Sequence, residues 1–142
     1  MKTRHAAPVF QVADLEASLK HYTEVLGFSH DFRFGDYAGV QLGDVCLQLC
    51  GHSIHQRPIG GGTAYIFCAE PVDAYYAELV SRGATLIAPP KNYAYGMRDF
   101  IAVDLDGNHL AFGCRSEDAT SVPKSISNLD HTGLSPESGN VI

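Results

Sequence analysis

The feature that most constrains the fold of this chain is a pattern of elements that occurs twice. In the first copy, a strand-like run at 6–12 is followed by Asp14, a good N-cap, and by apolar residues at helical spacing up to Gly27, a helix stop. In the second copy, Glu70 and Gly83 enclose a helix of the same length. Three strands follow each helix. The pattern predicts two βαβββ units, an α+β fold with curved mixed sheets.

Turn residues separate the expected strands. Gly35-Asp36 and Gly43-Asp44 form turns in the first copy, and Asp106-Gly107-Asn108 precedes the last strand of the second. Pro71 suits the first turn of the second helix. The expected strands are 6–12, 28–34, 37–42, 45–50, 63–69, 84–88, 99–104 and 109–114, with a longer loop at 89–98. One unit leaves a sheet face uncovered, so two units, within or between chains, can enclose a cavity.

Composition bounds the class of protein. Hydrophobic residues make up 45% and charged residues 18% of the 142 positions, and no apolar run approaches the roughly 18 residues of a membrane span. The net charge of −6 argues against nucleic acid as a partner. The four cysteines form no CxxC pair, which favours buried free thiols in a reducing compartment. We expect a cytoplasmic protein without a membrane partner.

The domain organisation follows from the same pattern. We expect one domain at 1–115, with units at about 6–50 and 63–115, and a polar C-terminal tail at 116–142. The tail carries four acids and one base, and its composition favours disorder. The linker at 51–62 ends in three glycines but lacks the Lys and Ser/Thr of a phosphate-binding loop.

Several motifs resemble the vicinal oxygen chelate superfamily, which includes glyoxalases, extradiol dioxygenases and bleomycin-resistance proteins. The last hairpin, Asp104-Leu-Asp-Gly-Asn-His-Leu-Ala-Phe112, is typical of the superfamily. Bleomycin-resistance proteins in particular are similar at Pro8-Val9, at 25–32, 36–40 and 63–67, and at the loop Tyr95-Gly96-Met97-Arg98-Asp99-Phe100. The resemblance covers about residues 6–115. It implies a homodimer with clefts shared by both chains and a first strand exchanged at Pro8. An ordinary edge-strand proline is the alternative for Pro8.

The resemblance also implies four positions at which the metalloenzymes of the superfamily hold a metal ion. Here those positions read Ala7, Gln48, Thr63 and Ala111. Zinc or iron needs three or four converging His, Glu or Cys ligands, so we expect no metal and no cofactor. An atypical set would draw on His5, Cys46, Gln48, Cys50 and His109. Of these, we assign His109 to the strand face opposite Ala111.

Aromatic residues are the positive candidates for a site. The resemblance implies that Tyr37, Tyr65, Phe67 and Tyr95 flank a flat ligand, and strand alternation adds Phe32 and Gln48 on faces that point to the same cleft. Aromatic walls suit planar or cationic molecules. The competing interpretation is that aromatic residues at alternating strand positions belong to the core. The predicted ligand-binding residues are Phe32, Tyr37, Gln48, Tyr65, Phe67 and Tyr95.

The function we expect is metal-free binding of a planar or cationic, bleomycin-like small molecule, which amounts to antibiotic resistance by sequestration. No residues are assigned to catalysis. Two alternatives stay open. One is a metal-dependent lyase, isomerase or extradiol-type dioxygenase of the same superfamily with atypical ligands. The other is a dimeric scaffold with a vestigial cleft.

Overall fold

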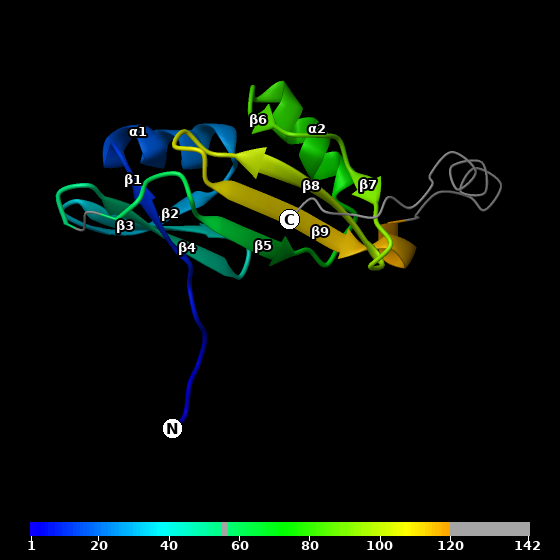
Figure 1. Ribbon diagram of the computed structural model, residues 1–142, viewed down its shortest axis with the longest axis horizontal. Coiled ribbons are helices and arrows are strands. Elements are labelled where there is room, and N and C mark those ends of the chain that lie inside the picture. The colour runs from blue at the N-terminus through cyan, green and yellow to red at the C-terminus, as the bar shows by residue number, and fades with distance from the viewer. Residues whose placement is uncertain (55–56, 120–142) are drawn as a thin grey trace.

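The computed structural model describes residues 1–54 and 57–119 of the chain and contains both predicted units (Figure 1). The first unit consists of β1 (Val9–Val12), α1 (Leu15–Lys20), the π-helical turn η1 (His21–Val25), β2 (Ser29–Phe34), β3 (Tyr37–Leu42) and β4 (Val45–Gly51). The second consists of β5 (Thr63–Phe67), α2 (Asp73–Ser81), β6 (Thr85–Leu86), β7 (Lys91–Asn92), β8 (Met97–Val103), β9 (His109–Arg115) and the 3-10 turn η2 (Ser116–Ala119). The predicted α+β fold of two βαβββ units is confirmed.

Each unit forms its own mixed sheet. The strand order is β1-β4-β3-β2 in the first sheet and β5-β9-β8-β6 in the second, where β7 also pairs with β8. The first strand of each unit runs parallel to its last strand, and the remaining pairs are antiparallel. Figure 1 shows the two sheets side by side, with α1 and α2 on the same side of the strands. We call the face of each sheet that points away from the helices its open face.

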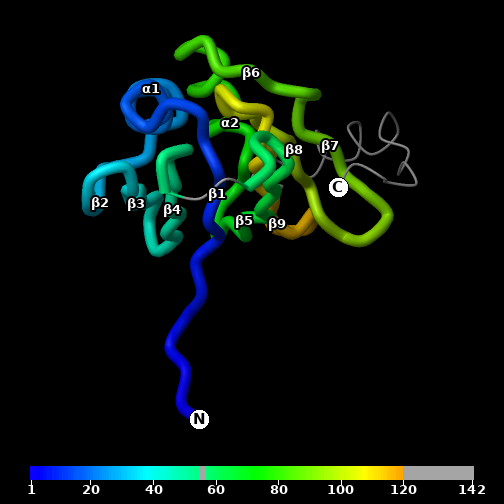
Figure 2. Tube along the Cα trace, turned by 60° about the vertical axis from the view of Figure 1, so that its left-hand side comes forward, coloured from blue at the N-terminus to red at the C-terminus, as the bar shows by residue number. Residues whose placement is uncertain are grey.

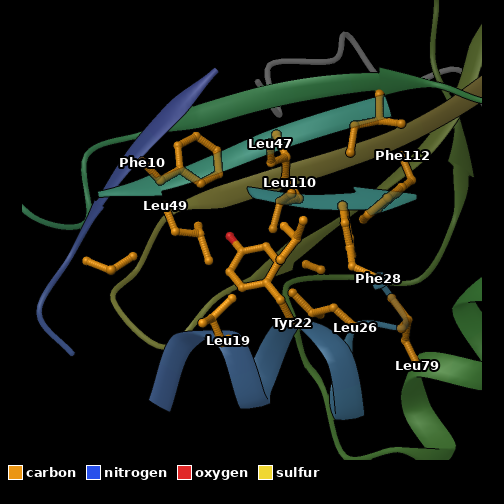
Figure 3. Close-up of a cluster of buried hydrophobic side chains, with 14 of the residues drawn as sticks. Phe10, Leu19, Tyr22, Leu26, Phe28, Leu47, Leu49, Leu79, Leu110 and Phe112 are labelled. Atoms are coloured by element: carbon orange, nitrogen blue, oxygen red, sulfur yellow. The ribbon is translucent and has the colours of Figure 1, made fainter. Parts of the chain in front are cut away.

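The core lies between the sheets and the helices, and it contains residues of both units (Figure 3). Alternate residues of β4 and β9, including Leu47, Leu49, Leu110 and Phe112, point towards the helices and are fully buried. Tyr22 of η1 packs against them and is also fully buried. Because one cluster includes side chains from both sheets, burial of apolar surface holds the two units together.

The predicted turn before β9 connects distant parts of the chain. Asp104 Oδ1 accepts hydrogen bonds from the backbone N–H groups of Asp106 and Asn108, each at 2.9 Å. Its other oxygen accepts from the Tyr22 hydroxyl and from the Asn108 amide. Asn108 Oδ1 in turn accepts from the backbone N–H of Gly62 at 2.8 Å. The turn therefore joins the second unit to the first helix and to the linker.

Several boundaries differ from the prediction. β1 begins at Val9 rather than residue 6, because the preceding residues extend away from the sheets (Figures 1 and 2). β5 ends at Phe67, and the short strand β7 lies within the predicted loop at 89–98. α2 begins at Asp73, so Pro71 lies before the helix and outside its first turn.

The remaining expectations concern membranes, thiols and the tail. Within residues 1–54 and 57–119, no helix has the length and apolarity to cross a membrane. All four cysteines are free thiols, with Cys50 and Cys114 buried. Of the tail expected at 116–142, residues Ser116–Ala119 form the η2 turn, and residues 120–142 lie outside the described residues.

Candidate functional site

The predicted site residues of the first unit lie together on the open face of its sheet. Phe32 of β2 pairs with Gly39 of β3, and Gly39 pairs with Gln48 of β4. Tyr37 lies two positions before Gly39 and projects to the same face. Its hydroxyl donates to Gln48 Oε1 at 2.5 Å, and its ring stacks on Phe32 with centroids 6.4 Å apart. The structure therefore brings Phe32, Tyr37 and Gln48 into one group.

A glycine makes this arrangement possible. A Cβ atom at Gly39 would lie 2.3 Å from Cε1 of Phe32, which no real contact allows. The missing side chain in the middle of β3 thus lets the Phe32 ring lie over the strand. Phe34 lies beside Phe32, with ring centroids 6.4 Å apart, and is 79% exposed. Apolar rings exposed in this way are available to a ligand or to another protein surface.

The predicted residues of the second unit form a separate group on the open face of the second sheet. Tyr65 and Phe67 alternate on β5, with ring centroids 4.9 Å apart. The Tyr65 hydroxyl donates to Asp99 Oδ2 at 2.9 Å, and the Tyr95 hydroxyl donates to the same oxygen at 2.6 Å. One carboxylate oxygen therefore orients two of the three predicted side chains. Phe67, which is 74% exposed, presents its ring to solvent beside them.

Asp99 is a site residue that sequence reasoning missed. It is 1% exposed, and its Oδ1 has no hydrogen-bond partner among residues 1–54 and 57–119. Lys91 of β7 lies opposite Asp99 in the strand register, with Nζ 5.8 Å from the centre of the Tyr93 ring. Burial of a carboxylate is costly without compensating donors. One feature of the sequence could have identified Asp99: it is an acidic residue directly before the apolar run 100–103 on a predicted strand.

The Tyr65 side chain reaches Asp99 by crossing a second glycine. Tyr65 pairs with Ala111 of β9, whereas Asp99 pairs with Gly113, two residues further along. A Cβ atom at Gly113 would lie 2.0 Å from the Tyr65 hydroxyl oxygen. The phenol therefore occupies the space that a side chain at this position would fill.

The tyrosines of both groups stay protonated at neutral pH. Burial, followed by the hydrogen bond to Asp99 and its charge, raises the pKa of Tyr65 above the ordinary value of 10.0. The same causes, in the same order, raise the pKa of Tyr95. Burial is also the main cause that raises the pKa of Tyr37. These tyrosines can therefore stack on a ligand and donate hydrogen bonds. In the second group, Asp99 accepts the hydrogen bonds of Tyr65 and Tyr95.

Two hollows adjoin the groups. One, of about 570 Å³, lies beside β1 and the inter-unit linker and is lined in part by Gln11, Tyr37 and Arg57. The other, of about 450 Å³, lies between β4 and β5, and Tyr65 and Phe67 line it. Tyr37 thus belongs to a different hollow from Tyr65 and Phe67. The six predicted residues divide between two sheets of one chain.

The four positions that hold metal in the resembled enzymes do not form a ligand set here. Ala7 and Ala111 end in methyl groups, and the Gln48 oxygen accepts the hydrogen bond of Tyr37. Thr63 is exposed at the start of β5. Within the described ranges, no three His, Cys, Asp or Glu side chains come together as a group that could hold a metal ion. A catalytic metal therefore does not fit these residues.

The assignment of His109 to the face opposite Ala111 is wrong. Positions two apart on a strand share a face, and His109 pairs with Thr63 just as Ala111 pairs with Tyr65. His109 is therefore half-buried on the open face. It gains no metal partners there among residues 1–54 and 57–119.

Comparison with known proteins identifies relatives of the same architecture. Residues 4–112 match the model of the Glyoxalase/Bleomycin resistance protein/Dioxygenase superfamily. Among curated proteins, no sequence matches the chain significantly.

Solved structures are similar over most of the chain. The bleomycin-binding protein of bleomycin-producing Streptomyces verticillus, solved with copper(II)-bleomycin, is 29% identical with a TM-score of 0.67, covering 79% of this chain and 96% of that one. A glyoxalase/bleomycin resistance protein/dioxygenase from Nocardioides is 22% identical with a TM-score of 0.65, covering 87% and 91%. TioX from Micromonospora sp. ML1 is 18% identical with a TM-score of 0.64, covering 78% and 99%. The last two similarities show the shared fold.

Proposed function

Because this chain belongs to the glyoxalase/bleomycin resistance protein/dioxygenase superfamily, we propose that it is a metal-free protein that sequesters a planar or cationic, antibiotic-like small molecule. The observation that carries the proposal is the pair of aromatic groups on the open faces, Phe32 with Tyr37 and Tyr65 with Phe67. Rings placed in this way stack on flat ligands and attract cations, each contact contributing about 0.5–2 kcal/mol. Sequestration requires no chemistry, in keeping with the lack of a ligand set at the four metal positions.

The charge near the second aromatic group supports a cationic or hydrogen-bonding ligand. Asp99 lies beneath the phenols of Tyr65 and Tyr95, and its Oδ1 has no hydrogen-bond partner in the described part of the chain. The chain as a whole carries a net charge of −6. A negative field attracts cationic molecules to the protein before they reach the site.

We place the ligand in a cleft between two copies of the chain. The two aromatic groups lie on different sheets and border different hollows. We propose that a single ligand that touches both groups meets the first sheet of one subunit and the second sheet of its partner. In such a homodimer, each cleft would combine Phe32, Tyr37 and Gln48 with the partner's Tyr65, the partner's Phe67 and the partner's Tyr95.

The N-terminal segment supports an exchange between the two subunits. Residues 1–8 point away from the sheets on the side opposite the helices (Figures 1 and 2). The Pro8 carbonyl still accepts from the backbone N–H of Gln48 at 2.9 Å, so the segment leaves its own sheet at this proline. A segment that extends beyond such a hinge can pair with a second copy. This is the exchanged first strand that the resemblance implies.

The similarity to the Streptomyces verticillus protein supports the kind of ligand. That protein was solved with copper(II)-bleomycin and is the 29% identical structure described above. We therefore propose a bleomycin-type drug as the first ligand to test, both copper-loaded and copper-free.

Titration of tyrosine fluorescence with such drugs tests the proposal. We expect saturable quenching at one site per subunit, with dimers in sedimentation velocity. Phe67→Ala should weaken binding by about tenfold, while Tyr76→Phe, away from the open faces, should not.

Absence of saturable quenching at millimolar concentration across several drugs would reject drug binding. Stoichiometric zinc, iron or manganese after mild purification would favour the enzyme alternative.

A further inference from the structure

Gln11 is a buried amide with an unusual environment. Its neighbours Phe10 and Val12 belong to the core, so Gln11 projects from β1 to the open face. The residue is 7% exposed, and neither its Oε1 nor its Nε2 has a hydrogen-bond partner among residues 1–54 and 57–119. Burial of an amide without partners is unfavourable. A ligand with matching groups would restore both hydrogen bonds.

The other glutamines of the described ranges show the usual arrangement. Gln41 Nε2 donates to the Gly43 carbonyl at 2.9 Å, and Gln48 Oε1 accepts from Tyr37 at 2.5 Å. Each is also more exposed than Gln11. The lack of hydrogen-bond partners at Gln11 is therefore due to its position in the fold and is not common to the glutamines of the described ranges.

That place is the wall of the larger hollow, of about 570 Å³. Gln11 and Tyr37 both pair with Cys50 in the strand register, so the three residues form a row across β1, β4 and β3. Arg57 and Pro58 of the linker line the hollow as well. The hollow is thus lined by the residue that carries the unpaired amide, whose polar atoms are covered in the unliganded protein, and by an aromatic side chain, and it has room for a small planar molecule.

We infer that Gln11 anchors a binding subsite for the amide edge of a small molecule, an N–H donor next to a C=O acceptor, as in a primary carboxamide or a lactam. A primary amide has both a donor and an acceptor, so two such edges can form a pair of parallel hydrogen bonds. Tyr37 lies beside this edge and can contact the planar body of the ligand. The inference rests on Gln11 and its hollow alone and does not depend on drug binding.

The experiment uses the full ¹⁵N-labelled chain and three probes of similar size. Benzamide offers a donor and an acceptor, methyl benzoate offers acceptors only, and benzoate carries a negative charge. The side-chain NH₂ signals of Gln11 are identified by their loss in Gln11→Leu. We expect benzamide to shift these signals saturably and to bind about tenfold more tightly than methyl benzoate, the effect of one matched hydrogen bond. Tighter binding of benzoate would assign the subsite to Arg57 and overturn the inference.

Two variants and one control complete the test. Gln11→Leu should keep or raise the thermal midpoint, since it removes a buried unpaired amide, and should abolish the preference for benzamide. Gln11→Glu keeps the side-chain length but replaces the amide donor with a carboxylate oxygen. It should keep the preference, because this oxygen accepts from the benzamide N–H, whereas methyl benzoate has no donor to offer it. Gln41→Leu should retain the preference as well. The inference fails if benzamide leaves the Gln11 signals unmoved up to its solubility limit, or if the preference survives in Gln11→Leu.

Discussion

The hydroxyl of Tyr22 in the first unit donates to Oδ2 of Asp104 in the second unit at 2.8 Å (Figure 3 shows the oxygen of Tyr22 within the core). Tyr22 is 0% exposed and Asp104 is 6% exposed. Burial, together with the charge and hydrogen bond of Asp104, raises the pKa of Tyr22, so the phenol remains a donor. This contact fixes the helical segment of one unit on the last turn of the other.

Removal of this hydroxyl should destabilise the fold. Tyr22→Phe leaves the buried Asp104 oxygen with one donor fewer, and we expect a loss of about 1–3 kcal/mol in the free energy of unfolding. Urea denaturation measures this loss. Tyr76→Phe is the matched control, because the hydroxyl of Tyr76 makes no hydrogen bond within the described residues while its ring packs on Phe100. Equal losses in the two variants would contradict the role of the Tyr22 contact.

A methyl group at Gly113 should displace the Tyr65 phenol from Asp99. The new Cβ would meet the hydroxyl oxygen at 2.0 Å, so Gly113→Ala forces the ring to move. We expect a loss of about 1–3 kcal/mol in stability and a change in the near-ultraviolet circular dichroism of tyrosine. Gly61→Ala serves as the control, because a Cβ there would meet nothing within 4 Å. An unchanged tyrosine signal in Gly113→Ala would refute the proposed position of the phenol.

Alkaline pH should destabilise the protein through the tyrosines of the second group. The pKa values of Tyr65 and Tyr95 lie above 10.0 in the folded state, so the unfolded chain ionises first as the pH rises. Their contribution is complete below about pH 10 and is lost as the pH rises through the folded pKa values. Denaturation at about pH 8 and pH 10.5, with absorbance at about 295 nm to follow ionisation, measures it. Tyr65→Phe should reduce the pH dependence, and an unchanged slope would count against the prediction.

Acid should weaken the contact between α2 and β8. Arg98 donates to both carboxylate oxygens of Asp73, at 2.9 and 2.7 Å, and lowers the pKa of Asp73 below 3.8. The stabilisation is therefore complete above the unfolded pKa and is lost as the pH falls through the lower folded value. Asp73→Asn should reduce the loss of stability between about pH 5 and pH 2.5. Glu78→Gln, which removes an acid of an exposed pair with Arg82, should leave that acid dependence largely intact.

Local patterns were sufficient to predict most elements of the fold. Alternation identified the strands, and Gly27 and Gly83, both with positive φ, follow the helical segments as expected of helix stops. The short strand β7 was missed because two residues carry no detectable periodicity. The first strand was overextended because the apolar residues before Val9 look like a strand but make no ladder there.

The candidate site was predicted only in part. Alternation correctly placed Tyr65 and Phe67 on one face of β5, because which face a strand residue occupies is a local property. It could not show that the two groups border different hollows, since that depends on how the two sheets pack. In the sequence, Gly39 and Gly113 likewise look like ordinary strand residues. Only the structure shows that the side chains of Phe32 and Tyr65 cross them.

By itself, the sequence determined the two βαβββ units and the turn before β9, because these depend on residue type and on spacing along the chain. The resemblance to the superfamily marked four metal positions, and the sequence showed that none of them holds a strong metal ligand. Only the tertiary structure decided that Asp99 orients two tyrosines, that Tyr22 reaches Asp104, and that Gln11 lies unpaired beside a hollow. Each of these facts depends on the distance between side chains that are far apart in sequence or on the burial of one side chain by several elements. Such distances and burials exist only after the sheets and helices have packed together.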